Sequence, residues 1–92
     1  HIVKIISQSV VRNIRQGIVD GFYRADINPD IMAITRLILI EAPFNPELFS
    51  KDRFNFIEVQ TQLFDFFVHG LCTEKGKKLY QKYKEDHHQP SI

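Results

Sequence analysis

The sequence predicts an all-α protein of four helices. Apolar residues recur at three- and four-residue steps over long stretches, as they do along one face of a helix. Helix-start residues precede these stretches, and we find no strand pattern. The 92 residues suffice for one domain, and 43% of them are hydrophobic, including eight Phe. This is much apolar material for a chain whose core must be small, and it suggests a partner.

The first two helices are predicted from their spacing and their ends. The first is expected from Ile2 to Asp20, with Gly21 in its C-cap position. Asn28 then caps the second helix, where Pro29 needs no hydrogen bond in the first turn and Asp30 faces the positive end of the dipole. The second helix therefore begins at Pro29.

The second and third helices are both unusually apolar. The second, Pro29 to about Ala42, is apolar nearly all round, so several of its sides should be buried. Ser50 or Asp52 is expected to cap the third helix, Asp52 to Cys72, which would be about 30 Å long. The solvated side of the second helix is marked only by Asp30, Arg36 and Glu41.

The third helix carries more apolar surface than one neighbour can cover. On a wheel of about 100° per residue its apolar arc spans roughly 200°, whereas a helix packed on one core needs about 100°. A helix with two buried sides usually packs on its own chain and on something else, either further chain or a second copy. The sequence therefore indicates an association module rather than a catalyst.

A short fourth helix is expected to close the domain. Thr73 is its N-cap residue, and Leu79, Tyr80 and Tyr83 would hold it against the body. We take residues 1–86 as the domain and 87–92 as a flexible tail. The fourth helix also contains a cluster of lysines, which either form a solvated helix face or make a weak contact with an anionic partner: Lys75, Lys77, Lys78, Lys82 and Lys84.

Composition and motifs argue against several classes of function. The net charge of +1 is too balanced to predict nucleic-acid binding by these residues. No apolar run is long enough for a membrane helix, and the single Cys72 fits a reducing cytoplasm. Asp65, His69 and Cys72 lack a second ligand pair for a metal, and no catalytic constellation accompanies them. We therefore expect no metal, no cofactor and no enzyme activity.

Two stretches carry a resemblance to a known family. One is the pattern Gly-x-x-x-Gly-x-x-Arg-x-Asp-x-x-Pro over residues 17–29, and the other is the aromatic segment 63–79 with Phe-x-x-Gly-Leu at residues 67–71. With a buried helix between them, they resemble the C-terminal domain of tetracycline-repressor (TetR)-type bacterial transcription regulators, from Ile2 to about Tyr83. No helix-turn-helix is present, and the chain opens in mid-pattern. We therefore expect it to be the C-terminal piece of a longer protein.

The resemblance implies a homodimer that senses an unknown small-molecule effector and controls DNA binding by a missing N-terminal domain. The second and third helices would form a four-helix bundle with the partner subunit. The dimer interface implied in this way comprises Ile31, Ile34, Ile38, Phe56, Val59, Gln60, Leu63, Phe66, Phe67 and Gly70. The candidate effector pocket comprises Ser7, Phe22, Met32, Thr35 and Leu39, although core packing also explains its three large apolar members.

Several polar or small positions have two interpretations. Gln60 lies inside the apolar arc, where it would bond a nearby backbone carbonyl or fix register by a hydrogen bond to the partner subunit. Gly70 either precedes the helix end or admits a close partner backbone. Ser7 and Thr35 would offer hydroxyls to an effector or bond back to their own helices. The alternative function is a helical interaction module without a ligand.

Overall fold

The computed structural model describes the backbone of residues 2–87 and the side chains of residues 8–86, so the predicted tail beyond residue 87 lies outside it. Within this part there is no strand, only one isolated bridge between Tyr23 and Cys72. The predicted all-α class is therefore confirmed. The helices are α1 (Ile2–Val19), α2 (Pro29–Glu41), the 3-10 helix η1 (Ala42–Phe44), α3 (Phe56–Leu71) and α4 (Glu74–His87).

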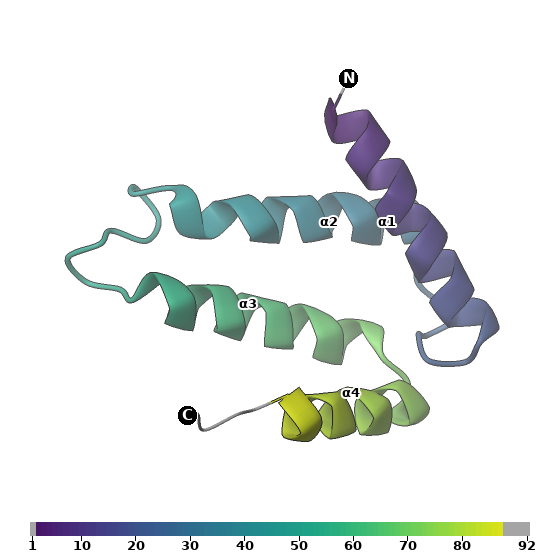
Figure 1. Ribbon diagram of the computed structural model, residues 1–92. Helices are drawn as coiled ribbons and strands as arrows, with labels where there is room; N and C mark the ends of the chain where they lie inside the picture. The colour runs from purple at the N-terminus through teal and green to yellow at the C-terminus, as the bar shows by residue number, and fades with distance from the viewer. Residues whose placement is uncertain (1, 88–92) are drawn as a thin grey trace.

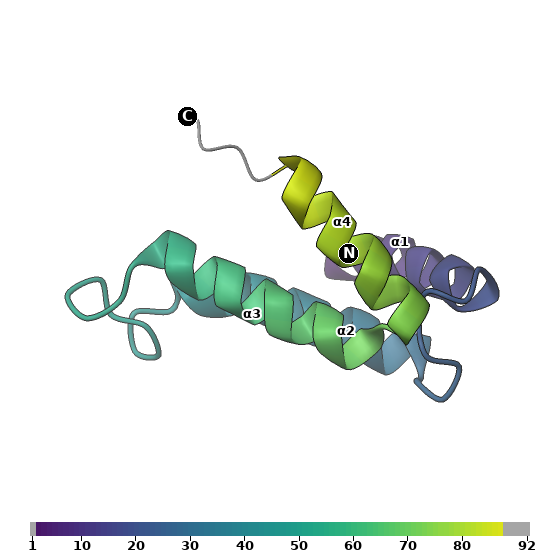
Figure 2. The same ribbon diagram turned by 90° about the horizontal axis from the view of Figure 1, so that it is seen from below.

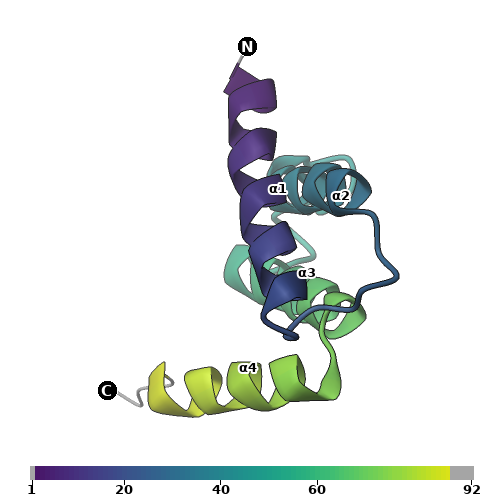
Figure 3. The same cartoon turned by 90° about the vertical axis from the view of Figure 1, so that its right-hand side faces the viewer.

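The four α-helices form an open arrangement. α2 and α3 lie side by side and antiparallel, while α1 crosses the beginning of α2 (Figures 1 and 3). α4 turns back along α3 but lies obliquely to it (Figure 2). The radius of gyration is 14.6 Å, whereas a compact domain of this length is expected near about 12 Å. The chain is thus less compact than a self-contained domain of its size.

Local residue choices set the start of α2 and the end of α1 as the sequence predicts. The side chain of Asn28 accepts hydrogen bonds from the backbone N–H groups of Asp30 and Ile31 at 2.9 and 3.3 Å. After α1, Gly21 adopts a φ of 82°, and the chain closes with hydrogen bonds from Gly21 N–H to Ile18 and from Phe22 N–H to Gly17. This pair of bonds is the Schellman ending that glycine favours.

The start of α3 differs from its prediction. Asn55, not Ser50 or Asp52, caps the helix, and its side-chain oxygen accepts a hydrogen bond of 2.9 Å from the Glu58 backbone N–H. Residues 50–54 instead form a turn, in which the Phe54 N–H donates to the Ser50 carbonyl at 3.0 Å. Three potential caps stand within six residues, so local preference alone does not choose between them. α3 is therefore 16 residues long and shorter than predicted.

The core of the chain is small. Among the described side chains, the buried apolar residues are Ile14, Ala33, Pro43, Val59, Phe67, Val68, Leu71 and Cys72. The accessible surface of 7070 Å² exceeds the roughly 5500 Å² expected for a monomer of 10.8 kDa. Much apolar side-chain area consequently faces solvent.

One junction ties the end of α1 to the connection between α3 and α4. The Thr73 hydroxyl donates to the Gly21 carbonyl at 2.7 Å and accepts from the Gly76 N–H at 3.1 Å, which confirms its N-cap role. The Arg24 backbone N–H donates to the Leu71 carbonyl, and its guanidinium donates to the Gly70 carbonyl. A movement of α3 would therefore also displace the end of α1.

Candidate association surface

α2 exposes a continuous apolar stripe. Ile31, Ile34 and Ile38 have exposed fractions of 56, 56 and 60%. Their spacing places them on one face of the helix. They belong to the predicted interface, and the chain leaves them facing solvent. β-branched side chains in such a row form a rigid apolar ridge that another helix can pack against.

The stripe continues across the end of α2 to α3. Ile38 lines a cleft of about 630 Å³ together with Phe44 and Leu48, both of which are exposed. The Phe44 ring lies 4.9 Å, centroid to centroid, from the Phe56 ring at the start of α3. Exposed apolar residues thus run from one helix to the other without interruption. Sequence reasoning missed Phe44 and Leu48, because both lie between the second and third helices that the sequence predicts.

On α3 the predicted interface residues divide into two groups. Phe66 is 77% exposed, and Phe56 is partly exposed, whereas Leu63 is half-buried. Val59 and Phe67 are buried within the chain itself, so we assign them to its own core rather than to an interface. We call the exposed set the α2–α3 apolar surface: Ile31, Ile34, Ile38, Phe44, Leu48, Phe56 and Phe66.

Gln60 and Gly70 lie on the exposed part of α3. The Gln60 side chain is exposed and makes no hydrogen bond among the described residues, so the predicted local bond to a backbone carbonyl is not formed there. A Cβ added at Gly70 would meet no atom within 4 Å. Nothing in the described chain therefore requires glycine at position 70, and the predicted close approach of a partner remains its candidate reason.

The structure does not gather the predicted effector pocket into one site. Met32, Thr35 and Leu39 are half-buried on α2. Phe22, in the connection after α1, instead lies against the first turn of α4, where the Lys75 ammonium is 4.8 Å from its ring centroid. The Thr35 hydroxyl donates to the Ile31 carbonyl at 2.8 Å, which is the predicted bond to its own helix. The side chain of Ser7 lies outside the described residues.

A polar cluster holds α4 against α3. Asp65 accepts hydrogen bonds from the Tyr80 hydroxyl and the Lys84 ammonium, both at 3.1 Å. These residues line a cleft of about 940 Å³ between the two helices. The hydrogen bond from Lys84 lowers the pKa of Asp65, while burial raises the pKa of Tyr80 to about 12. Tyr80 thus holds α4 as predicted, whereas Leu79 and Tyr83 are mostly exposed.

Most of the α4 lysines have partners in the chain. Lys75 donates to the Asp20 carbonyl, Lys77 pairs with Glu74, and Lys84 pairs with Asp65. These bonds leave little reason to propose an anionic partner for this helix. Among the described residues, no three His, Cys, Asp or Glu side chains are close enough together to hold a metal ion.

Replacing Asp65 with Asn should remove a pH-dependent part of the stability. The folded-state pKa of Asp65 is lowered, so its pairing stabilises the fold above the ordinary Asp pKa and is lost as the pH falls through the lowered value. We expect a loss below about 1 kcal/mol at pH 7, because the partly exposed charges are screened. Urea unfolding at pH 7 and pH 2 should show the difference only at pH 7. Asp52→Asn, at an exposed position, should show none; equal effects of both variants would contradict the assignment.

Comparisons with known proteins leave the family open. No protein-family model, curated protein or solved structure matches the chain. The resemblance to TetR-type regulators therefore remains a prediction drawn from the residues at 17–29 and 63–79. None of the described helices is both long and apolar enough to cross a membrane.

Proposed function

We propose that this chain is the dimerisation and small-molecule-sensing domain of a TetR-like bacterial transcription regulator. The observation that carries the proposal is the α2–α3 apolar surface, in which six exposed large apolar residues run from α2 to the start of α3 and Phe66 is exposed further along α3. Monomeric proteins seldom expose apolar patches larger than a few hundred Å². The open shape of the chain and its large accessible surface support the same proposal.

A second copy is the occupant we propose for this surface. α2 and α3 already form an antiparallel pair, so two copies related by a two-fold axis would bring four helices together. Such an isologous interface would cover the same ridge in both subunits and bury about 800 Å² on each. Gln60 and Gly70 would then lie within or beside the interface.

The regulatory part of the proposal follows from the position of α1. α1 packs on α2, where Ala33 is fully buried, and its far end is tied to the α3–α4 connection by Thr73 and Arg24. A ligand that shifts α2 against α3 would move α1 in each subunit. In a dimer this would change the spacing of two DNA-reading heads outside these 92 residues, which must match half-sites about 34 Å apart.

We expect the chain to be a dimer over a wide concentration range. Light scattering coupled to size exclusion, run on a dilution series, measures the molar mass directly. A mass twice that of the chain at every dilution supports the proposal. A monomer at all concentrations would show that the α2–α3 apolar surface is not an interface between copies, and it would remove the main support for the regulator.

The alternative is a dimerising helical module without a ligand. It is favoured by the separation of Phe22 from the α2 members of the predicted pocket and by the local hydrogen bond of Thr35. Both functions predict the dimer, so the oligomeric state does not separate them. Ligand binding separates them, and Arg36 indicates the charge that such a ligand would carry.

A further inference from the structure

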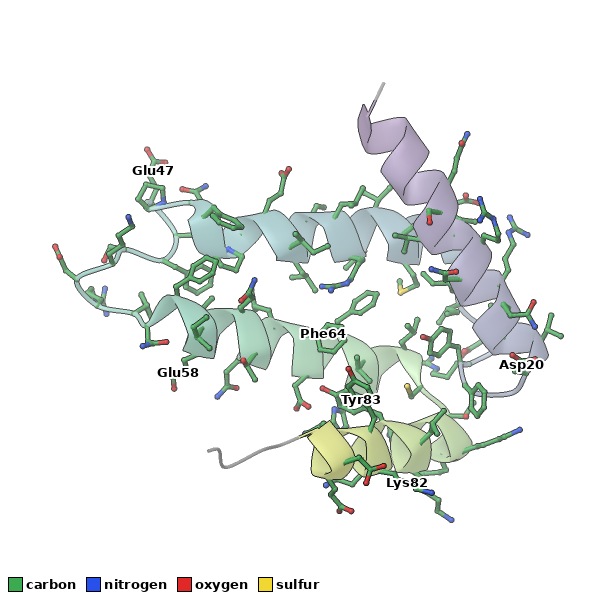
Figure 4. The ribbon with its side chains drawn as sticks, viewed as in Figure 1. Asp20, Glu47, Glu58, Phe64, Lys82 and Tyr83 are labelled. Atoms are coloured by element: carbon green, nitrogen blue, oxygen red, sulfur yellow. The ribbon has the colours of Figure 1, made fainter. Side chains whose placement is uncertain are left out.

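The guanidinium group of Arg36 lies between α2 and α3. Its Cζ atom is 4.7 Å from the centroid of the Phe64 ring and 5.9 Å from that of Phe67. Phe64, labelled in Figure 4, projects from α3 so that it lies near Arg36 of α2 on one hand and near Tyr80 of α4 on the other. Two aromatic rings thus position the guanidinium, although the sequence places Arg36 on the solvated side of α2. Arg36 is half-buried.

No acidic group balances this charge in the described chain. No Asp or Glu oxygen there lies within 4 Å of the Arg36 guanidinium nitrogens, and no guanidinium N–H group donates a hydrogen bond to an acceptor within the described residues. Arg15 and Arg24, in contrast, pair with Asp30 and Asp26. Burial lowers the pKa of Arg36, and no neighbouring carboxylate offsets this effect. A positive charge is thus partly removed from water without a counter-charge.

The surroundings of Arg36 are apolar. On α2, Met32 lies one helical turn before Arg36, and Leu39 and Ile40 lie one turn after it. Met32 and Leu39 are half-buried, and both belong to the predicted effector pocket. Arg36 therefore adds a charged group to the apolar positions that the sequence already suggested for a ligand. Its planar fork of N–H donors matches the two oxygens of a carboxylate.

We propose that Arg36 binds the carboxylate of a small organic anion whose flat apolar body lies against the apolar side chains that surround Arg36 on α2 and α3. This inference rests on the proposed sensing function and specifies its ligand class. The two carboxylate oxygens accept hydrogen bonds from the guanidinium, while Met32, Leu39 and the ring of Phe64 contact the apolar body. Binding would neutralise the charge between the two helices and change how closely they pack.

The test compares two probes that share a body and differ in charge. Binding of 2-naphthoate and of neutral 2-naphthamide to the 92-residue chain is measured by NMR titration, with the backbone amide signals of Met32 and Leu39 as local reporters that every variant retains. We expect the naphthoate to bind at least about tenfold more tightly than the amide. Arg36→Met should remove this preference and leave amide binding unchanged, whereas Arg36→Lys should keep part of it, because lysine retains the charge but lacks the fork.

Arg53 provides the matched control, because it also stacks on a phenylalanine but is exposed. Its Cζ atom lies 5.4 Å from the Phe54 centroid, and Arg53→Met should leave both probes unaffected. Equal affinity of the two probes, equal losses in both Met variants, or no binding of either probe would overturn the proposal. Circular dichroism of Arg36→Met and Arg36→Lys establishes that both remain folded.

The oligomeric state separates this proposal from the proposed function. If Arg36→Met turns a dimer into a monomer, Arg36 pairs with a carboxylate of the second copy, and the anion proposal is wrong while dimerisation stands. If the chain is a dimer and binds naphthamide and naphthoate equally tightly, the proposal that the ligand is an anion is wrong and dimerisation stands. A monomer that binds neither probe overturns both proposals.

Discussion

Replacing Ile34 with Lys is expected to convert the dimer into a monomer. Ile34 lies between Ile31 and Ile38 in the exposed stripe of α2 and is 56% exposed in the isolated chain. In the proposed dimer its side chain is enclosed by apolar neighbours, where an unpaired ammonium group loses its water without a counter-charge. We expect a loss of about 2 kcal/mol or more, which weakens dimerisation by about 30-fold or more.

The same change should leave the folded monomer nearly unaffected. Position 34 is exposed, and exposed substitutions usually alter stability by less than about 0.5 kcal/mol. Loss of the dimer with retention of the helical circular dichroism signal would therefore locate the interface rather than report unfolding.

Ile57→Lys is the matched control for this experiment. Ile57 is 63% exposed, but helical spacing places it on the opposite side of α3 from Phe66. Sedimentation equilibrium on both variants should give a monomer for Ile34→Lys and a dimer for Ile57→Lys. If both remain dimers, the subunits associate through another face; if both become monomers, the effect comes from added charge and not from the α2–α3 apolar surface.

The helix ends that depend only on residues close to them in the sequence were predicted correctly. Asn28, Gly21 and Thr73 end or begin helices as predicted, because each cap bonds to backbone groups within a few residues. Which of Ser50, Asp52 and Asn55 caps α3 could not be predicted in the same way. Each could cap locally, and the packing of the segment around Phe49 and Phe54, whose rings lie 5.3 Å apart, accompanies the later start.

The division of the apolar arc of α3 was beyond local reasoning. The wheel indicated two apolar sides, but it could not show that Val59 and Phe67 face the chain while Phe66 faces solvent. That division depends on where α2 and the segment through Phe44 pack. The exposed residues on the arc nonetheless include most of the predicted interface positions of α3, so the breadth of the arc was informative.

Long-range pairs explain the remaining differences. Asp65 meets Tyr80 and Lys84 only because α4 turns back along α3, and Arg36 meets Phe64 only because α2 and α3 run side by side. Neither pairing leaves a signal in the spacing of nearby residues. The composition of α2 does single out Arg36, because it is a charged residue within an otherwise apolar helix, but composition does not identify Phe64 as its neighbour.

Substituting Gly76 with Ala should destabilise the fold by disrupting the junction of α1 with α4. Gly76 is buried in the first turns of α4, and an added Cβ would overlap the backbone carbonyl of Phe22. Because this neighbour is backbone and is itself bonded to Thr73, it cannot move aside as a flexible side chain would. We expect a loss of about 1–3 kcal/mol from overpacking, despite the gain in helix propensity from alanine.

Gly70→Ala separates this steric effect from helix propensity. Both glycines lie within helices, but a Cβ at Gly70 meets open space, so alanine there should stabilise the isolated chain by up to about 1 kcal/mol. Urea unfolding in the Ile34→Lys background compares the two without a contribution from the dimer. Opposite signs for the two variants would show that close contact with Phe22 holds α4 to the end of α1. Equal stabilisation would mean that α4 docks loosely, in which case movement of α3 and α4 could not be transmitted to α1 through this junction.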